Sequence, residues 1–152
     1  MDIFEKPDLS DVKRLLVESG LPTGDITAQH LHHFFGCGPK SEIEGVVGLE
    51  IYGTVALLRS LAVTAAQRGL GLGSGLVEHA EGYAWGKGVK SLYLLTTTAE
   101  AFFRRSGYVR IPREEAPAAI KATREFSGIC PASSTFMVKR LTGNPQSLLR
   151  IT

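Results

Sequence analysis

The fold is decided by one stretch of the sequence, Leu61-Ala-Val-Thr-Ala-Ala-Gln-Arg68-Gly-Leu-Gly71-Leu-Gly73-Ser-Gly-Leu, which joins an apolar strand to a helix through alternating glycines. Glycine removes the Cβ atom where a ligand must approach the backbone, and the free N–H groups of a helix N-terminus attract an anion. Arg68 adds a charged side chain suited to phosphate oxygens. The glycine spacing fits neither the dinucleotide fingerprint nor a G-K-[ST] phosphate loop. The stretch therefore predicts an anion-binding turn, with a glycine-rich turn that binds nothing as the alternative.

The composition predicts one soluble domain. The chain has 152 residues, 43% of them hydrophobic and 21% charged, and its formal net charge is +2. No apolar run reaches the roughly 18 residues of a membrane helix, and the N-terminal residues lack the basic and apolar regions of a signal peptide. The dispersed charge predicts no nucleic-acid partner. Because Cys37 and Cys130 lie far apart in the sequence, we expect reduced thiols and a cytoplasmic protein.

Hydrophobic periodicity predicts alternating strands and helices. Strands are expected over residues 3–7, 34–37, 43–52, 55–63, 91–97, 108–111 and 135–140. Helices are expected over 8–19, from a cap at Asp25 or Thr27 to about Phe34, from the glycine-rich turn to about Gly86, and over 99–105 and 116–126. The helix between strands 55–63 and 91–97 implies that these strands run parallel. We expect one domain over residues 1–141 and a tail over 142–152.

A two-residue hairpin is expected where Gly53 and Thr54 separate two of these strands. In that register Glu50 faces Leu57 across the hairpin. Glu50 and Arg59 then share one face of the sheet in diagonal positions.

Two motifs stand in order along the chain. Arg68, Gly71 and Gly73 match the pattern R/Q-x-x-G-x-G/A after a strand ending L-x-V. Further on stands Thr96-Thr-Thr-Ala99-Glu-Ala-Phe102-Phe103-Arg-Arg-Ser-Gly107-Tyr108, close to N-x-x-A-x-x-F-Y-x-x-x-G-F. In this order and spacing they resemble motifs A and B of the GNAT family of N-acetyltransferases, over roughly residues 3–140. The resemblance implies an α/β fold with a mixed, strongly twisted central sheet flanked by helices on both faces.

The same resemblance implies that acetyl-CoA is the co-substrate. Its pyrophosphate is expected on the backbone of the turn formed by Arg68, Gly69, Leu70, Gly71, Leu72, Gly73 and Ser74. Its pantetheine is expected to pair with the strand end at Leu61, Ala62 and Val63, where a free N–H near Val63 holds the thioester carbonyl and the oxyanion. The second motif contributes Thr96, Ala99 and Phe103 to the co-substrate site.

The second motif departs from the family at Phe103 and Thr96. Phe103 replaces the tyrosine that usually protonates the leaving thiolate. A thiol with a pKa near ~8.5 is already a fair leaving group, so water, Tyr108 or another hydroxyl is expected to suffice. Thr96 replaces an asparagine, and threonine also caps helices.

The amine nucleophile must be neutral, so a proton acceptor is needed. Glu50 is the first candidate, because some members of the family carry a glutamate at the position of Leu57, which Glu50 faces. The alternative is a surface carboxylate paired with Arg59. Arg59 is expected at the substrate site, where binding a substrate carboxylate favours an amino-acid-like acceptor. Cys130 is expected to pack against or line the acceptor pocket.

The histidines at positions 30, 32 and 33 raise the question of a metal site. Only His30 and His33 are neighbours on a helix, and no cysteine or carboxylate cluster in the nearby sequence completes a ligand set. A solvent-facing helix and no metal are therefore expected.

A finer resemblance joins Gly45-Val-Val-Gly-Leu-Glu50, Leu57-Leu-Arg-Ser-Leu61 and Ile129-Cys-Pro-Ala-Ser to the small acetyltransferases of arsenic-resistance operons. It implies acetylation of a small-molecule primary amine, either amino-acid-like or a toxic, arsenic-linked compound. The family also implies a possible homodimer. The alternatives are a non-catalytic acyl-CoA sensor and a thiol-based arsenical-binding protein.

Overall fold

The computed structural model describes residues 2–142, so the predicted tail beyond position 142 lies outside the described residues. The strands are β1 (Ile3–Glu5), β2 (Phe34–Cys37), β3 (Gly45–Tyr52), β4 (Val55–Val63), β5 (Ser91–Thr96), β6 (Val109–Arg110) and β7 (Thr135–Arg140). The α-helices are α1 (Leu9–Glu18), α2 (Leu72–Gly86), α3 (Glu100–Arg105) and α4 (Ala118–Lys121). Short helical turns are η1 (His30–His33), η2 (Ala65–Gln67), η3 (Arg113–Glu115) and the π-helical η4 (Glu125–Ile129).

The strands form one mixed sheet in the order β1-β2-β3-β4-β5-β7-β6. β4 and β5 are parallel, as the helix between them requires, and every other neighbouring pair is antiparallel. The β3–β4 hairpin has the expected register, with Glu50 opposite Leu57 and Gly48 opposite Arg59.

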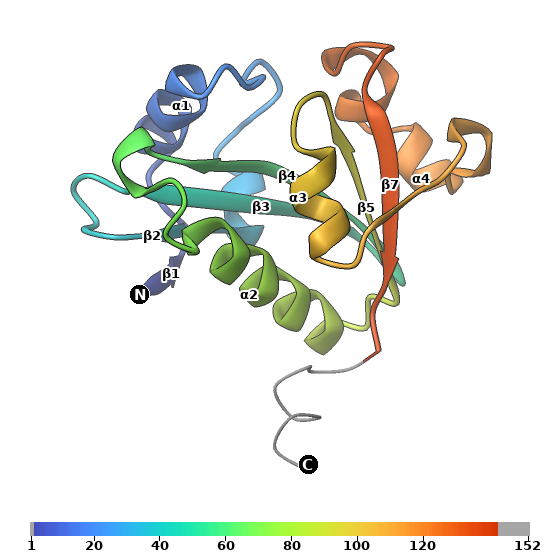
Figure 1. Ribbon diagram of the computed structural model, residues 1–152, viewed down its shortest axis with the longest axis horizontal. Helices are drawn as coiled ribbons and strands as arrows, with labels where there is room; N and C mark the ends of the chain where they lie inside the picture. Colours follow the sequence, from blue (N-terminus) through green and yellow to red (C-terminus); the bar gives the residue numbers. More distant parts are fainter. Residues whose placement is uncertain (1, 143–152) are drawn as a thin grey trace.

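Helices cover both faces of the sheet, as expected (Figure 1). On one face, Leu76, Val77, Ala80 and Ala84 of α2 pack with apolar side chains of β2 to β5 and with Phe103 of α3. On the other face, Val12, Leu15 and Leu16 of α1 pack against β2 and β3. Further along that face, Ile120 of α4 packs against Leu57 of β4 and Phe136 of β7. No helix within residues 2–142 has the length and apolar character to cross a membrane.

Two expected helices differ from the structure. The segment 116–126 is broken into α4 and η4, because Thr123 Oγ1 donates to the Ile120 carbonyl and accepts from the Phe126 amide, which gives the backbone a local alternative to one helix. The helix expected from Asp25 or Thr27 is only the 3-10 turn η1, and neither residue caps it. The carboxylate of Asp25 binds Arg59 instead.

Candidate active site

A pocket of about 650 Å³ opens where β4 and β5 separate. The two parallel strands pair only from Val55/Ser91 to Leu57/Tyr93, although β4 runs on to Val63 and β5 to Thr96. Beyond Leu57 of β4 and Tyr93 of β5, each strand pairs within the described residues only with its outer neighbour, and the two ribbons diverge (Figure 1). Residues of both strands line the pocket there. The wall is formed by residues 58–63 of β4, Arg68, residues 94–99, Phe103, the loop at 19–22, and residues 125, 129–131 and 134.

A β-bulge re-aims the end of β4. The register between β3 and β4 shifts next to Ser60, which has a φ of 60°. Before the bulge Leu58 faces α2, and strict alternation would place Ala62 on the same side. The bulge reverses the order, so that Leu61 and Val63 pack on the α2 side and Ala62 on the α1 side. A non-glycine residue in this conformation costs roughly 1–2 kcal/mol, and such strain concentrates at functional sites.

The glycine-rich turn leads from β4 into α2 with an open backbone. Gly69 and Gly71 have φ values of 82° and 85°, the region where side chains are disfavoured, and a Cβ at either position would meet nothing within 4 Å. Gly71 begins α2 without a side-chain cap, so the first N–H groups of this helix lack intrahelical acceptors. Arg68 is exposed, and its Nε donates to the Val63 carbonyl at 3.3 Å. The turn thus presents free amide donors and a cation beside the end of β4.

The second motif forms the opposite wall. Thr96 Oγ1 accepts a hydrogen bond from the Ala99 amide at 3.0 Å, in the turn that precedes α3, whose N-cap residue is Ala99 rather than Thr96. Phe103 is buried and packs edge-on against Tyr108. The Tyr108 hydroxyl points into the core and donates to Glu81 at 2.9 Å, and burial followed by the Glu81 charge raises its pKa well above the ordinary value. Tyr108 lies outside the pocket wall with its hydroxyl bound to Glu81, so among the expected proton sources for the leaving thiolate the structure favours water or another hydroxyl over Tyr108.

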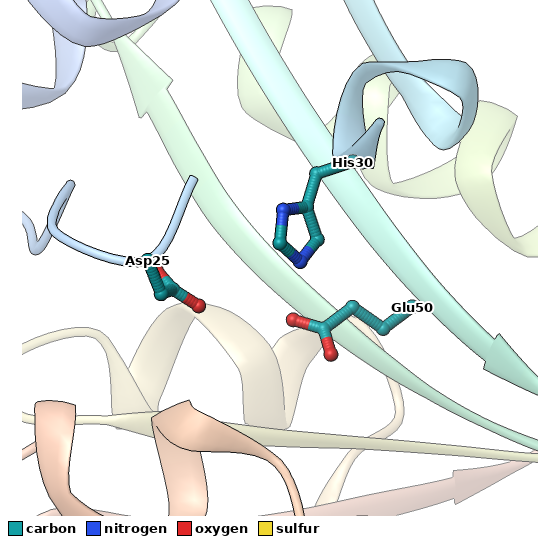
Figure 2. A group of neighbouring side chains, drawn as sticks. All are labelled: Asp25, His30 and Glu50. Atoms are coloured by element: carbon teal, nitrogen blue, oxygen red, sulfur yellow. The ribbon is translucent and has the colours of Figure 1, made fainter. Parts of the chain in front are cut away.

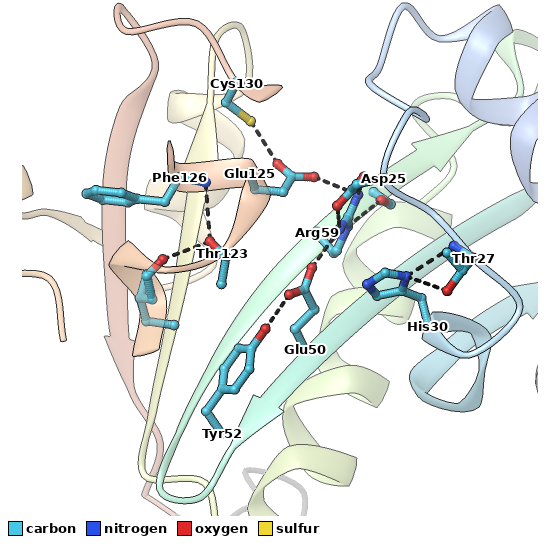
Figure 3. A network of polar contacts seen from close by, with 12 residues as sticks. Asp25, Thr27, His30, Glu50, Tyr52, Arg59, Thr123, Glu125, Phe126 and Cys130 are labelled. Atoms are coloured by element: carbon cyan, nitrogen blue, oxygen red, sulfur yellow. Dashed lines mark hydrogen bonds and ion pairs between the residues drawn. The ribbon is translucent and has the colours of Figure 1, made fainter. Parts of the chain in front are cut away.

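At the other end of the pocket, Arg59 holds three carboxylates (Figure 3). Its guanidinium donates to both oxygens of Asp25 at 2.5 and 2.7 Å and to Glu50 at 2.6 Å. Glu125 lies 3.0 Å from it, and the arginine side chain has no exposed surface. Burial alone would lower the pKa of Arg59, but Asp25, Glu125 and Glu50 outweigh it and raise that pKa. The cation is therefore permanent and fully paired.

The three carboxylates differ in their environment. Burial raises the pKa of Asp25, but the hydrogen bonds and charge of Arg59 outweigh burial and leave it below the ordinary value. Burial also raises the pKa of Glu125, and there Arg59 and the Cys130 thiol offset burial only in part, so it stays above its ordinary value. The Glu50 carboxylate accepts a second hydrogen bond, at 2.5 Å, from the Tyr52 hydroxyl.

Comparison with known proteins agrees with this geometry. A model of the acetyltransferase (GNAT) family matches residues 5–108. The chain belongs to the GNAT family of acetyltransferases.

One curated relative and two solved structures illustrate the relationship. An uncharacterized N-acetyltransferase of Chlorobaculum tepidum is 37% identical over 91 residues, 59% of this chain and 57% of that protein. The N-acetylglutamate synthase of Neisseria gonorrhoeae, solved with coenzyme A and N-acetyl-glutamate, superposes with a TM-score of 0.77 at 20% identity, over 93% of this chain and 35% of that one. A Mycobacterium tuberculosis protein solved with coenzyme A gives 0.76 at 18% identity, over 93% and 100%. The chain thus matches just over half the curated relative, and the solved structures show the shared fold.

Most of the site residues expected from the sequence line the pocket. Its wall includes Leu61, Ala62, Val63, Arg68, Thr96, Ala99, Phe103, Arg59 and Cys130. Two groups lie outside the wall, namely Glu50 and the turn residues from Gly69 to Ser74, which lead into the first turn of α2.

In the structure Glu50 pairs with Arg59 and lies outside the pocket wall, which favours the ion-pair interpretation over the role of base. The structure also corrects the role expected for Arg59, because a guanidinium enclosed by three carboxylates is closed to a substrate carboxylate. Sequence reasoning missed Asp25 and Glu125 as site residues. Asp25 had been interpreted as a helix cap, and Glu125 stood inside a helix predicted to be continuous.

His30 gains carboxylate neighbours that the local sequence does not show. Side-chain atoms of Asp25, His30 and Glu50 lie within 4.8 Å of one another (Figure 2), so two carboxylates distant in sequence join His30, which the expectation of no completing cluster did not include. Both carboxylates already bind Arg59, and the His30 Nδ1 atom contacts the Thr27 amide at 3.1 Å. The two carboxylates of this group are therefore already paired with a protein cation.

Proposed function

We propose that this chain is an acetyl-CoA-dependent N-acetyltransferase that acetylates a small-molecule primary amine by direct attack on the thioester. One observation carries the proposal: a pocket between the separated ends of β4 and β5 extends from Arg68, beside the glycine-rich turn, to Arg59 and its partner Glu125. A phosphate-bearing thioester and an amine can meet in such a pocket with their charged ends apart.

The glycine-rich turn supports the co-substrate assignment. Free N–H groups at the start of α2 and the exposed Arg68 provide the donors that a pyrophosphate needs. Among residues 2–142, no strand pairs with the inner edge of β4 beside Leu61, Ala62 and Val63, which leaves room for an extended pantetheine arm. Thr96, Ala99 and Phe103 would cover that arm from the β5 side.

In the proposed reaction, the amine lone pair attacks the acetyl carbonyl carbon, and a backbone N–H near Val63 stabilises the oxyanion. The C–S bond then breaks and the electron pair leaves with sulfur. Phe103 offers no proton to that thiolate, so its protonation falls to water or to one of the hydroxyl groups on the wall.

The proposed acceptor is either an amino-acid-like amine or a toxic, arsenic-linked amine. The names of the relatives do not mention arsenic, so the link to arsenic resistance rests on the sequence resemblance alone. The homodimer rests on the same resemblance. A cytoplasmic location is supported by the two free cysteines, which suit a reducing compartment.

A non-catalytic acyl-CoA sensor is the second candidate, and Phe103 favours it because this residue cannot donate a proton. The arsenical-binding alternative loses support, because Cys37 is fully buried and lies outside the pocket wall that contains Cys130.

Release of free thiol from acetyl-CoA over a panel of amines tests the proposal. An acetyltransferase releases thiol in proportion to acceptor and forms the N-acetyl product. A sensor binds acetyl-CoA in calorimetry and shows no acceptor-dependent release, which would refute the enzymatic function.

A further inference from the structure

One carboxylate at Arg59 differs from the other two in its access to the pocket. Among the described residues, the charged side chains on the pocket wall are Arg59, Arg68 and Glu125. Arg68 belongs to the co-substrate end and Arg59 is enclosed, so Glu125 is the charged group at the acceptor end that can meet a ligand.

The contacts of the three carboxylates explain this difference. Asp25 uses both oxygens on Arg59, and Glu50 uses one on Arg59 and the other on Tyr52. Glu125 has one oxygen 3.0 Å from Arg59, while the other accepts from the Cys130 thiol at 2.7 Å (Figure 3). A thiol is a weak donor that an ammonium group readily displaces or outcompetes.

We propose that Glu125 is a catalytic residue of this acetyltransferase, which binds the acceptor as an ammonium ion and takes its proton. The proposal rests on the proposed function. The ammonium proton passes to a Glu125 oxygen, and the freed nitrogen lone pair attacks the thioester carbon. Collapse of the intermediate releases coenzyme A as a thiolate, which takes the remaining excess proton from nitrogen, directly or through water. Glu125 then returns its own proton to solvent, so that the amide, a thiol and one proton are formed.

The surroundings of Glu125 suit this role. Burial raises its pKa, Arg59 and the Cys130 thiol lower it, and the nearby charges of Asp25 and Glu50 raise it again. The result lies above the ordinary value, which moves the carboxylate toward the pH range where a general base works best. Cys130 itself is a poor nucleophile, because burial and Glu125 raise its pKa to about 12.

This arrangement also selects the acceptor class. The acceptor end holds three carboxylates against one guanidinium, and that guanidinium is fully paired. A cation is therefore attracted, whereas a carboxylate next to the reacting amine meets repulsion and no free partner. The structure thus points to a cationic amine without a neighbouring carboxylate.

The first test is the pH profile of kcat/KM for Glu125→Gln. We expect kcat/KM of the variant to be about 100-fold or more below that of the parent near neutral pH. The difference between the two should narrow as pH rises, because free amine accumulates. Acetyl-CoA affinity in calorimetry should match the parent. Glu115→Gln, an exposed carboxylate on η3, is the matched control and should keep the parent profile. A Glu125→Gln protein with the parent's rate and profile overturns the proposal.

The second test uses Cys130→Ala, which keeps the carboxylate. The thiol lowers the pKa of Glu125, so its removal should shift the acidic limb of the profile to higher pH, while Cys37→Ala in the core should leave that limb in place. An unmoved limb in Cys130→Ala overturns the proposal even if Glu125→Gln fails to fold. A parent protein that binds acetyl-CoA but transfers nothing refutes the proposed function as well, whereas an active parent with unaffected variants refutes only the role of Glu125.

Discussion

Replacing Arg59 by methionine tests the charge arrangement of the site most directly. Methionine preserves an unbranched apolar side chain of related length but leaves Asp25, Glu50 and Glu125 without their shared cation. Removing one partner from a buried ion pair typically costs about 3–5 kcal/mol, because a buried charge is left uncompensated. The arginine side chain has no exposed surface, so its ion pairs are buried and this cost applies without a reduction for exposure. We therefore expect the free energy of unfolding to fall by about 4 kcal/mol. At this chain length the melting temperature should fall by about 8–16 °C.

The pH dependence of that loss has a definite sign. In the parent, the lowered pKa of Asp25 contributes stability above its unfolded value, and this contribution is lost as pH falls through the folded pKa. In the variant, burial without Arg59 favours the protonated carboxyls, so the variant gains relative stability as pH falls. The difference in the free energy of unfolding between parent and variant should therefore be largest near neutral pH and should shrink toward about pH 4.

Urea denaturation followed by circular dichroism at both pH values measures these differences. Arg104→Met is the control, because Arg104 pairs with Glu100 at the surface with 61% of its side chain exposed, and its loss should have no measurable effect. The reasoning would be refuted if the free energy of unfolding fell no further in Arg59→Met than in this control, or if it fell equally at neutral pH and at about pH 4.

Three further predictions concern binding and turnover. Arg68→Glu should weaken acetyl-CoA binding about tenfold or more in calorimetry without lowering the melting temperature. Lys121→Glu, an exposed charge reversal on α4, is the control and should keep the parent affinity. Equal affinities of the Arg68→Glu variant and the parent would refute phosphate binding at the glycine-rich turn. Glu50→Gln should keep an acidic limb in the kcat/KM profile but move it to lower pH, because the Glu50 charge raises the pKa of Glu125, and it should lower stability. Complete loss of that limb would return the role of base to Glu50. In pairs of an amine and its α-carboxylated amino acid, the amine should have a kcat/KM at least about tenfold higher, and the opposite order in a thiol-release assay would refute the acceptor class.

The parts of the fold that depend on local physics could be predicted from the sequence. The hairpin at Gly53 and Thr54 fixes which residues of β3 and β4 face each other, so the contact between Glu50 and Arg59 followed from turn geometry alone. The glycine-rich turn and the parallel pairing of β4 with β5 likewise depend on neighbouring segments.

The parts that depend on distant contacts could not be predicted. The bulge at Ser60 follows from no residue preference, because serine rarely adopts a positive φ. Asp25 has the side chain of a helix cap, and only the folded chain shows that Arg59, 34 residues away, binds it instead. The break that creates η4 depends on hydrogen bonds of Thr123, a residue compatible with a helix in isolation. Each of these features lies at the pocket or at Arg59, which is why the site was less predictable than the fold.

The carboxylates that Arg59 binds also explain why a charged base can function beside a guanidinium. Arg59 alone would hold Glu125 ionised at low pH and make it a weak proton acceptor. The charges of Asp25 and Glu50 oppose that effect and raise the pKa of Glu125, together with burial. When Glu125 takes a proton, the repulsion among the three carboxylates falls while Arg59 keeps its other partners. Asp25 and Glu50 therefore act as positioning residues, because their charges raise the basicity of Glu125 while all three carboxylates share one cation.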